Sequence, residues 1–462
     1  MEASQIQFNN ESAKIAFNTE HRKRILYNIG KYDHAAKEGR TFFSNLDLAR
    51  SRAGFYKYKS INELEKYLIE FESRFTSRGG KVYWAVDAQD AVRFILKLLK
   101  KYSVKQVVKS KSMTSEEIEL NRELESHNIT PVETDLGEFI VQLAGQKPYH
   151  IVTPAMHMSA ADVAQLFEEK FGLGQERTPH EITAFVRQHL REKFMAAGAG
   201  ITGANFLIAD TGSVAITENE GNGLLSTAMP DLHIVIAGIE KIVPSIDQLD
   251  LFWPLLATHG TGQYLTAYNS LLSGPGGENE TDGPEEMYVI LLDNGRTQLL
   301  AKEKQRRALS CIRCGACLNA CPVYRNIGGH TYGTTYTGPI GAVIAPHMKN
   351  LRDLNHLSFA SSLCGKCTEV CPVKIPLHEL LLFNRKDAVE KGMVQSGWKY
   401  AMFISKQAFL NRWMMDKGRK GLKRYLLQKF LKKQWGPRRR LPELANQSFR
   451  KQWMDNHGNV GQ

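Results

Sequence analysis

Seven cysteines constrain this chain of 462 residues more than any other feature, because all of them fall between Cys311 and Cys371. The first run reads C-x2-C-x2-C-x3-C-P from Cys311, and the second reads C-x2-C-x3-C-P from Cys364. The first pattern is the bacterial ferredoxin run. A disulfide scaffold would scatter its cysteines, and zinc sites use paired short spacings. The cysteines therefore predict two iron–sulfur clusters.

The ferredoxin rule that the cysteine before proline ligates the other cluster assigns the ligands. Cluster 1 takes four thiolates, from Cys311, Cys314, Cys317 and Cys371. Cluster 2 takes three, from Cys321, Cys364 and Cys367. The missing position falls on Ser361, so the fourth ligand is Ser361, another side chain or water, or the cluster is a three-iron type. An open iron could also bind substrate. We expect [4Fe-4S] clusters, and two one-electron carriers side by side predict an electron relay.

Charge and hydropathy restrict location and partners. The N-terminus lacks a secretory pattern, and no apolar run approaches the ~18 residues of a membrane span, so we expect a cytoplasmic protein. The net charge of +12 is concentrated between Lys417 and Arg440, where eleven basic and no acidic residues occur. This predicts a local basic tail and no nucleic-acid partner. Its apolar residues at helical spacing, Leu422, Tyr425, Leu426 and Phe430, allow peripheral contact with an anionic membrane or packing on the protein.

Strand-like and helix-like segments alternate before the cysteines, which predicts an α/β fold with a parallel sheet covered by helices. The expected strands are 81–86, 106–112, 129–134, 149–154, 231–239 and 287–295, with two further strands in 203–223 joined by a turn at 210–213. The expected helices are 61–75, 87–102 with Asp87 as N-cap, 114–128, 136–145, 160–171, 180–197 and 301–310. Residues 273–286 are rich in Gly and Glu and predict a loop.

Changes of pattern predict four parts. They are a helical N-terminal extension (1–60), an α/β domain (61–304), an α-helical ferredoxin domain with two clusters (305–400) and a basic helical tail (401–462). Between the cysteine runs, the stretch 328–343 is rich in Gly and Thr. Its glycines either let backbone approach a cluster or only form turns.

Several polar residues outside the cysteine runs are candidates for a small-molecule pocket. Lys109, Lys111 and Ser112 follow a predicted strand at the sheet edge where ligands of α/β folds bind, and could hold a carboxylate or phosphate. A solvated loop is the alternative. Asp135 and Glu138 have the spacing of a capping box, with a catalytic acid pair as the sharper alternative.

Glu218 lies in a Thr-Glu-Asn block at a strand end, similar to the block that carries the nucleophilic glutamate of CoA transferases. The following glycine comes one residue late, so a retained pocket or a plain turn is expected rather than CoA transfer. Of the scattered histidines, His157 near the sheet edge and His330 beside the clusters are the candidates to test. GPGGEN lacks the dinucleotide spacing, so NAD or FAD is not implied.

Blocks along nearly the whole chain resemble the lactate-utilisation protein B family, an iron–sulfur subunit. The matching segments are 109–113, 133–143, 154–159, 205–223, 261–268, 282–296, the cysteine runs, 328–343, 364–381 and the closing LPELANQSFRKQW. The seven-cysteine arrangement is similar to the family pattern too.

The resemblance implies a fold and a function. The α/β domain would share the fold of sugar-phosphate isomerases and CoA transferases, and the cysteine region that of the iron–sulfur subunit of succinate dehydrogenase. Family members oxidise L-lactate to pyruvate with two companions, a cysteine-rich protein and a second lactate-utilisation-domain protein, and so permit growth on lactate. The electron acceptor stays open, with quinone as the candidate. The alternative is a self-contained small-acid oxidoreductase with its pocket in the α/β domain.

Overall fold

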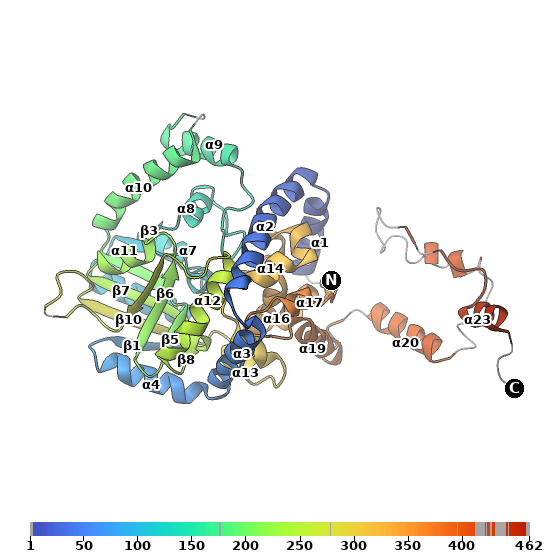
Figure 1. Cartoon of the computed structure of the whole chain (residues 1–462). Helices are drawn as coiled ribbons and strands as arrows, with labels where there is room; N and C mark the ends of the chain where they lie inside the picture. Colours follow the sequence, from blue (N-terminus) through green and yellow to red (C-terminus); the bar gives the residue numbers. More distant parts are fainter. Residues whose placement is uncertain are drawn as a thin grey trace. The chain divides into compact units, whose positions relative to one another are not determined.

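The computed structural model describes residues 3–174, 177–277, 279–394, 396–411, 421, 423–425, 427–429, 440–441 and 443–458. The chain forms two compact units, Met1–Lys391 and Gly392–Gln462 (Figure 1). The second unit contains the helices α20 (Ser396–Leu410) and α23 (Phe449–His457). Leu422, Leu426 and Phe430 of the predicted tail helix lie outside the described residues. In the described part of the chain, every helix is too short or too polar to span a bilayer.

A six-stranded parallel sheet forms the centre of the first unit, as the alternating pattern predicts. Its order is β1-β10-β7-β4-β2-β3, and every neighbouring pair is parallel. The strands are β1 (Lys81–Ala85), β2 (Gln106–Lys109), β3 (Thr130–Glu133), β4 (Ala199–Gly203), β7 (Leu232–Gly238) and β10 (Glu286–Leu292). Because the strands are parallel, the loops after all of them meet at one edge.

Alternate side chains of the central strands face opposite layers. Ile234 packs with Ile95 of α5 (Ala88–Lys101) and with α7 (Leu120–Ser126). Val235 packs with Phe71 of α4 (Leu64–Thr76) and with the second sheet. Asp87 caps α5 as predicted, since its side chain accepts a hydrogen bond from the backbone N–H of Asp90.

A second sheet, which the sequence pattern did not reveal, has the order β8-β5-β6-β9. Its strands are β5 (Phe206–Ile208), β6 (Ser213–Glu218), β8 (Ile242–Val243) and β9 (Tyr268–Leu272). The predicted two-stranded turn is confirmed, because β5 and β6 pair antiparallel. The short strand β8 and the partly exposed β9 carry too little periodicity to be recognised alone.

Two predicted elements are wrong, and a third is divided. The helix predicted over 114–128 is broken at Glu119, whose φ of 52° is left-handed, into α6 (Met113–Glu117) and α7. Residues 149–154 form no strand, because their hydrogen bonds close within the segment. The backbone N–H of Tyr149 donates to the carbonyl of Pro154, and the N–H groups of Val152 and Thr153 donate to Nδ1 of the His150 ring. The segment 301–310 is a turn followed by the 3-10 helix η4 (Gln305–Ser310) rather than an α-helix.

The remaining helices complete the first unit. Around the sheets lie α6 (Met113–Glu117), α8 (Leu136–Leu143), α9 (Ala160–Phe171), α10 (Pro179–Met195), α11 (Asn222–Ala228), η2 (Ile239–Lys241), η3 (Ile246–Gln248), α12 (Leu249–Gly260) and α13 (Arg296–Leu300). At the N-terminus are α1 (Ala3–Ala16), α2 (Thr19–Gly39), η1 (Arg40–Phe42) and α3 (Leu46–Asn62). The cysteine region contains α14 (Ala316–Ala320), α15 (Pro322–Ile327), η5 (His330–Tyr332), α16 (Gly338–Met348), α17 (Leu351–Phe359), α18 (Lys366–Glu369) and α19 (Leu377–Glu390).

One hydrophobic core joins the N-terminal helices to the cysteine region. Phe8 of α1, Ile29 of α2, Leu249 of α12 and Leu381 of α19 all belong to it. The cysteine region therefore folds against the N-terminal helices and the α/β part within one compact unit. The four-part division of the chain stays a prediction.

Candidate functional site

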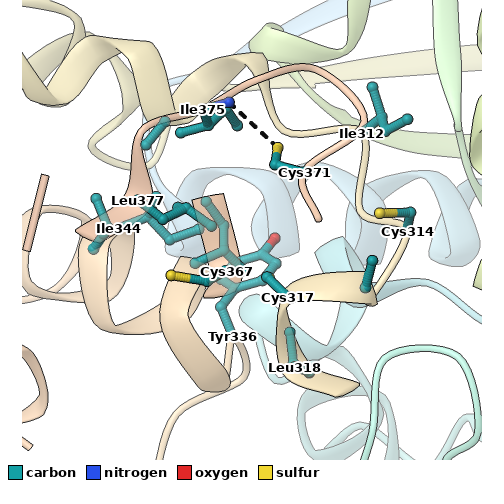
Figure 2. Packing of buried hydrophobic residues seen from close by; sticks show 14 of the residues in the cluster. Ile312, Cys314, Cys317, Leu318, Tyr336, Ile344, Cys367, Cys371, Ile375 and Leu377 are labelled. Atoms are coloured by element: carbon teal, nitrogen blue, oxygen red, sulfur yellow. Dashed lines mark hydrogen bonds between the residues drawn. The ribbon is translucent and has the colours of Figure 1, made fainter. Parts of the chain in front are cut away.

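Four cysteines line one small cavity, and they are the four that the ferredoxin rule assigns to cluster 1: Cys311, Cys314, Cys317 and Cys371. The rest of its wall is mostly aliphatic and consists of Ile151, Ile312, Arg313, Gly315, Leu318, Ile340, Pro372, Val373, Ile375 and Leu377. Figure 2 shows Cys314, Cys317 and Cys371 among these side chains. Four soft thiolate donors in an apolar cavity are the ligand set that an iron–sulfur cluster requires.

The thiols influence one another electrostatically in two groups. Burial, together with the neighbouring Cys311 thiol, raises the pKa values of Cys314 and Cys317. Burial raises the pKa of Cys371 to about 11, and Cys311 adds to the effect. The pKa of Cys367 is raised to about 11 by burial and then by Cys321. Bound iron would reverse this, because a metal-bound thiol loses its proton outright.

The second group contains Cys321, Cys364 and Cys367. Cys321 and Cys367 are buried, whereas Cys364 is exposed. Among the described residues, no three His, Cys, Asp or Glu side chains converge on a point where one metal ion could sit.

Backbone N–H groups donate to several of these sulfurs. The N–H of Ile375 lies 3.3 Å from Cys371 Sγ (Figure 2), and that of Tyr324 lies 3.5 Å from Cys321 Sγ. Such bonds favour the charged thiolate and tune the potential of a cluster.

The two cysteine runs share a local conformation. Arg313 and Leu363 both have positive φ values, of 63° and 55°, and each is followed by a cysteine and a left-handed glycine. The N–H of Arg313 donates to Cys311 Sγ over 3.4 Å. In the second run, the N–H of Leu363 donates to Ser361 Oγ over 3.1 Å. Ser361 thus occupies the backbone position that Cys311 occupies in the first run.

The glycines between the runs approach protein rather than cysteines. A Cβ at Gly328 would lie 1.7 Å from Tyr149 Oη, and one at Gly329 would lie 1.8 Å from the Tyr149 carbonyl oxygen. Gly341 has the same relation to the carbonyl of Tyr336, at 2.0 Å. Gly328 and Gly329 therefore allow the cysteine region to pack closely on the loop before α9, and Gly341 allows a close approach within the cysteine region.

A larger cavity of about 380 Å³ lies at the edge of the parallel sheet where the strands end. Loops after β2, β3 and β4 line it, together with the end of β6 and part of the cysteine region. Among the predicted pocket residues, Lys111, Ser112 and Glu218 line this cavity, whereas Lys109 and His157 are not part of its wall. Cys314 lines both cavities, so the larger one borders the cluster 1 site.

Lys109 is a buried ion-pair partner. Its side chain is 1 % exposed, and its Nζ donates to Glu133 Oε1 over 2.6 Å and to Asn121 Oδ1 over 2.5 Å. Lys109 is therefore neither part of a solvated loop nor available to an added anion, because Glu133 and Asn121 already engage its buried ammonium group. Lys111 instead donates to the Val152 carbonyl over 3.0 Å and lies 3.4 Å from Asp135 Oδ2.

The predicted capping box at α8 is half correct. Asp135 caps the helix by accepting from the N–H of Glu138 over 3.0 Å. Glu138 does not reach back to close the box. It is buried, and burial together with Glu133 raises its pKa well above the usual value.

Glu218 binds the backbone at the start of helix α11. Its two carboxylate oxygens accept the N–H groups of Gly223 and Leu224 at 2.7 and 2.8 Å, at the beginning of α11. The side chain faces the cavity but is engaged by backbone, which favours the turn interpretation over a free nucleophile.

His157 and His330 come together around one tyrosine. The rings of His157 and Tyr149 stack at 4.8 Å, and His330 lies 4.9 Å from His157. Burial, and then His330, lower the pKa of His157 to about 3. Such a neutral, stacked histidine has a packing role in the described structure.

The sequence reasoning missed a buried charge network that joins the α/β part to the first cysteine run. Glu240 accepts from Arg296 Nε at 2.5 Å and from Arg313 Nη2 at 3.1 Å. Arg296 also forms two bonds to Glu117, at 2.9 and 2.8 Å. These residues are scattered through the sequence without a shared motif. The one available signal was Arg313, a charged residue inside a cysteine run.

Comparisons with known proteins agree with this architecture. A family model described as the LUD domain matches residues 68–292, and one described as a 4Fe-4S dicluster domain matches residues 307–375. The fold and the cysteine-lined cavity thus define the class, a LUD-domain protein with a dicluster ferredoxin region.

Named relatives specify the family. A protein named Lactate utilization protein B from Bacillus cytotoxicus is 47% identical over 332 residues, which cover 72% of this chain and 70% of the relative. An Escherichia coli protein named uncharacterized electron transport protein YkgF is 40% identical over 425 residues, with 88% of each chain covered. The crystal structure of a DUF162 family protein from Deinococcus radiodurans, 15% identical, covers 50% of this chain and 98% of its own with a TM-score of 0.29. The chain belongs to the lactate utilization protein B family.

Proposed function

We propose that this chain is the iron–sulfur electron-transfer subunit of a complex that oxidises L-lactate to pyruvate and so permits growth on lactate. The observation that carries the proposal is the single apolar cavity that Cys311, Cys314, Cys317 and Cys371 line together. Ligands from both runs in one cavity are what a two-cluster ferredoxin domain requires.

The residues of this chain hold and insulate the carriers. Bound iron–sulfur clusters would supply reversible one-electron transfer. Conversion of lactate to pyruvate releases two electrons and two protons, which matches two such carriers. Aliphatic side chains exclude water from the first cysteine group, and backbone N–H groups stabilise the thiolates of Cys321 and Cys371. Exposed Cys364 would place the second group nearest to solvent and to an acceptor.

Family membership supports a lactate-utilisation system with other subunits. The proposed partners are a cysteine-rich companion and a second LUD-domain companion, and a quinone is the candidate acceptor. A cytoplasmic location is part of the proposal, with the basic tail as the segment that could meet an anionic membrane.

The first experiment determines iron and sulfide content and EPR spectra of anaerobically purified protein, before and after dithionite. About eight irons with signals of interacting reduced cubanes would support two four-iron clusters, and about seven irons with an oxidised three-iron signal would support a genuine gap at Ser361. Zinc, or no iron, would overturn the electron-relay proposal. Clusters that resist reduction would leave a structural role.

A second candidate is a self-contained oxidoreductase acting on a small acid. The observation that favours it is the larger cavity, because its wall includes both Lys111 and the cluster-1 cysteine Cys314. L-lactate is then added anaerobically to the protein with and without its companions. Bleaching of cluster absorbance by lactate with this protein alone would support the second candidate, and bleaching only with the companions would support the first.

A further inference from the structure

The larger cavity has carboxylates that are already engaged. Glu218 accepts two N–H groups of α11, Glu220 accepts the N–H of Leu136 at 3.2 Å, and Asp135 caps α8. Lys111 is also engaged, by Asp135 and the Val152 carbonyl. At this end of the cavity the charges satisfy one another.

Arg313 differs from these groups. Its side chain is 9 % exposed, and one guanidinium nitrogen, Nη2, donates to Glu240. The other nitrogen, Nη1, is buried without a hydrogen-bond partner in the described structure. Arg313 lines the larger cavity beside Cys314. A buried guanidinium donor that lacks an acceptor costs free energy, so a site that keeps one is expected to receive an acceptor from elsewhere.

Lys241 is the second cation of this wall. It is the last residue of η2, which follows β7, and it lines the same cavity. Within the described part of the chain its ammonium group has no hydrogen bond or ion pair, and Arg313 is among its electrostatic neighbours. Glu240 and Cys311 are the acidic groups that act on Lys241, and Glu240 is already shared by Arg296 and Arg313. With the Cys311 thiol protonated or bound to a cluster, the Arg313–Lys241 end of the cavity carries more positive than negative side-chain charge.

We propose that the cavity binds a small monocarboxylate of the 2-hydroxy or 2-oxo acid class, with its carboxylate between Arg313 Nη1 and the ammonium group of Lys241. A carboxylate supplies the two acceptor oxygens that a guanidinium and an ammonium group can share. The cavity volume of about 380 Å³ is ample for such a ligand. The acid class rests on the proposed function, whereas the anion site rests on the two cations.

The site would bring the acid against the wall that carries Cys314. The 3-10 helix η2, which follows strand β7 of the parallel sheet, contributes Lys241, and the first cysteine run contributes Arg313. The acid would thus be held at the junction of the α/β part and the cysteine region, on the side of cluster 1. The competing role for the same two cations is to balance the negative charge of a bound cluster, with no ligand in the cavity.

Equilibrium dialysis of labelled L-lactate and labelled pyruvate against the anaerobic holoprotein tests the site, with lactamide as the uncharged competitor. We expect saturable binding that unlabelled acid displaces and lactamide does not. Lys241→Gln and Arg313→Gln should each weaken binding about tenfold or more, since each removes a charge-assisted contact. The exposed Lys304→Gln, outside the cavity, is the charge-matched control.

The variants separate the outcomes. If Arg313→Gln loses its clusters, Lys241→Gln decides, once its iron content and EPR signals match those of the wild type. That match is measured because Cys311 is an electrostatic neighbour of Lys241. No saturable binding to the wild type, or a greater loss in Lys111→Gln than in Lys241→Gln, overturns the proposal. Cluster reduction by lactate in the presence of the companions is measured in the same preparations. Its failure would reject the proposed function, whereas its success without binding to this chain would reject the anion site alone.

Discussion

The backbone N–H of Leu363 donates to the hydroxyl oxygen of Ser361 over 3.1 Å. The equivalent bond in the first run goes to the sulfur of Cys311. The second run therefore keeps the backbone of a four-cysteine motif and changes only the atom at the first ligand position. A hydroxyl is a weaker iron ligand than a thiolate.

Ser361→Cys should supply the missing thiolate of cluster 2. After brief exposure to air, we expect the wild type to decline to about seven irons with an oxidised three-iron EPR signal, and Ser361→Cys to retain about eight irons. The exposed neighbour variant Ser362→Cys is the matched control. Equal iron loss in Ser361→Cys and in the control would show that this position does not face the cluster.

Cluster 2 should also be the first to lose iron to a chelator. Cys364 is exposed, whereas Cys314, Cys317 and Cys371 of the other group are buried. Incubation with ferricyanide and EDTA should therefore remove about half of the iron in a fast phase, with cluster 1 released slowly. Iron release is followed by a colorimetric assay and the remaining cluster by EPR. A single phase for all the iron would contradict this difference in access.

Glu240→Gln should destabilise the first unit. Burial opposes its charge, but Arg296 and Arg313 overcome this and lower the pKa of Glu240 to about 2. Removing the negative charge leaves Arg313 without its ion-pair partner and Arg296 with Glu117 alone, a change that costs about 3–5 kcal/mol. The midpoint of anaerobic thermal unfolding measures it, with the exposed Glu303→Gln as control. An unchanged midpoint would mean that the network does not stabilise the junction.

The buried pair of Lys109 and Glu133 predicts a non-additive double mutant. Lys109→Met leaves the Glu133 carboxylate buried beside Asn121 without its cation, and Glu133→Leu leaves the buried Lys109 ammonium group without the Glu133 carboxylate. Each substitution should lower the free energy of unfolding by about 3–5 kcal/mol. The double variant should recover a large part of this, since it removes both buried charges. Urea unfolding of the four proteins gives the cycle. Additive losses would show that the two charges act independently.

Much of this architecture follows from local patterns in the sequence. Alternating apolar residues were sufficient to predict five of the six parallel strands, and Asp87 was sufficient to predict the start of α5. The strand β4 was missed because Ala199 to Gly203 contains small residues, and Gly200 packs so closely that a Cβ would lie 1.7 Å from the Ser226 carbonyl. The segment 149–154 has a strand-like composition, but its hydrogen bonds close within the loop.

In the candidate site too, local sequence patterns identify some residues and long-range contacts decide the rest. Short-range spacing identified the cysteines, because ligand chemistry imposes it. The burial of Lys109 depends on its ion pair with Glu133, which is 24 residues away in sequence, and no local pattern predicts that contact. Arg313 and Lys241 become neighbours only when the first cysteine run packs on the sheet edge.

His233 should make the stability of the α/β part depend on pH. Its ring lies within β7 and bonds to Thr202 Oγ1 at 2.8 Å, and burial lowers its pKa from 6.5 to about 3. The folded state holds the neutral ring, so its contribution is fully present above the unfolded pKa of 6.5 and is lost as pH falls toward about 3. In that window each such group changes the free energy of unfolding by about 1.4 kcal/mol per pH unit.

His233→Gln, which can still bond to Thr202, should reduce the loss of stability between about pH 6 and pH 5 by about this amount. Urea unfolding followed by circular dichroism measures both proteins at the two pH values. The exposed His34→Gln is the control, and equal pH slopes for His233→Gln and wild type would mean that His233 is protonated in the folded state.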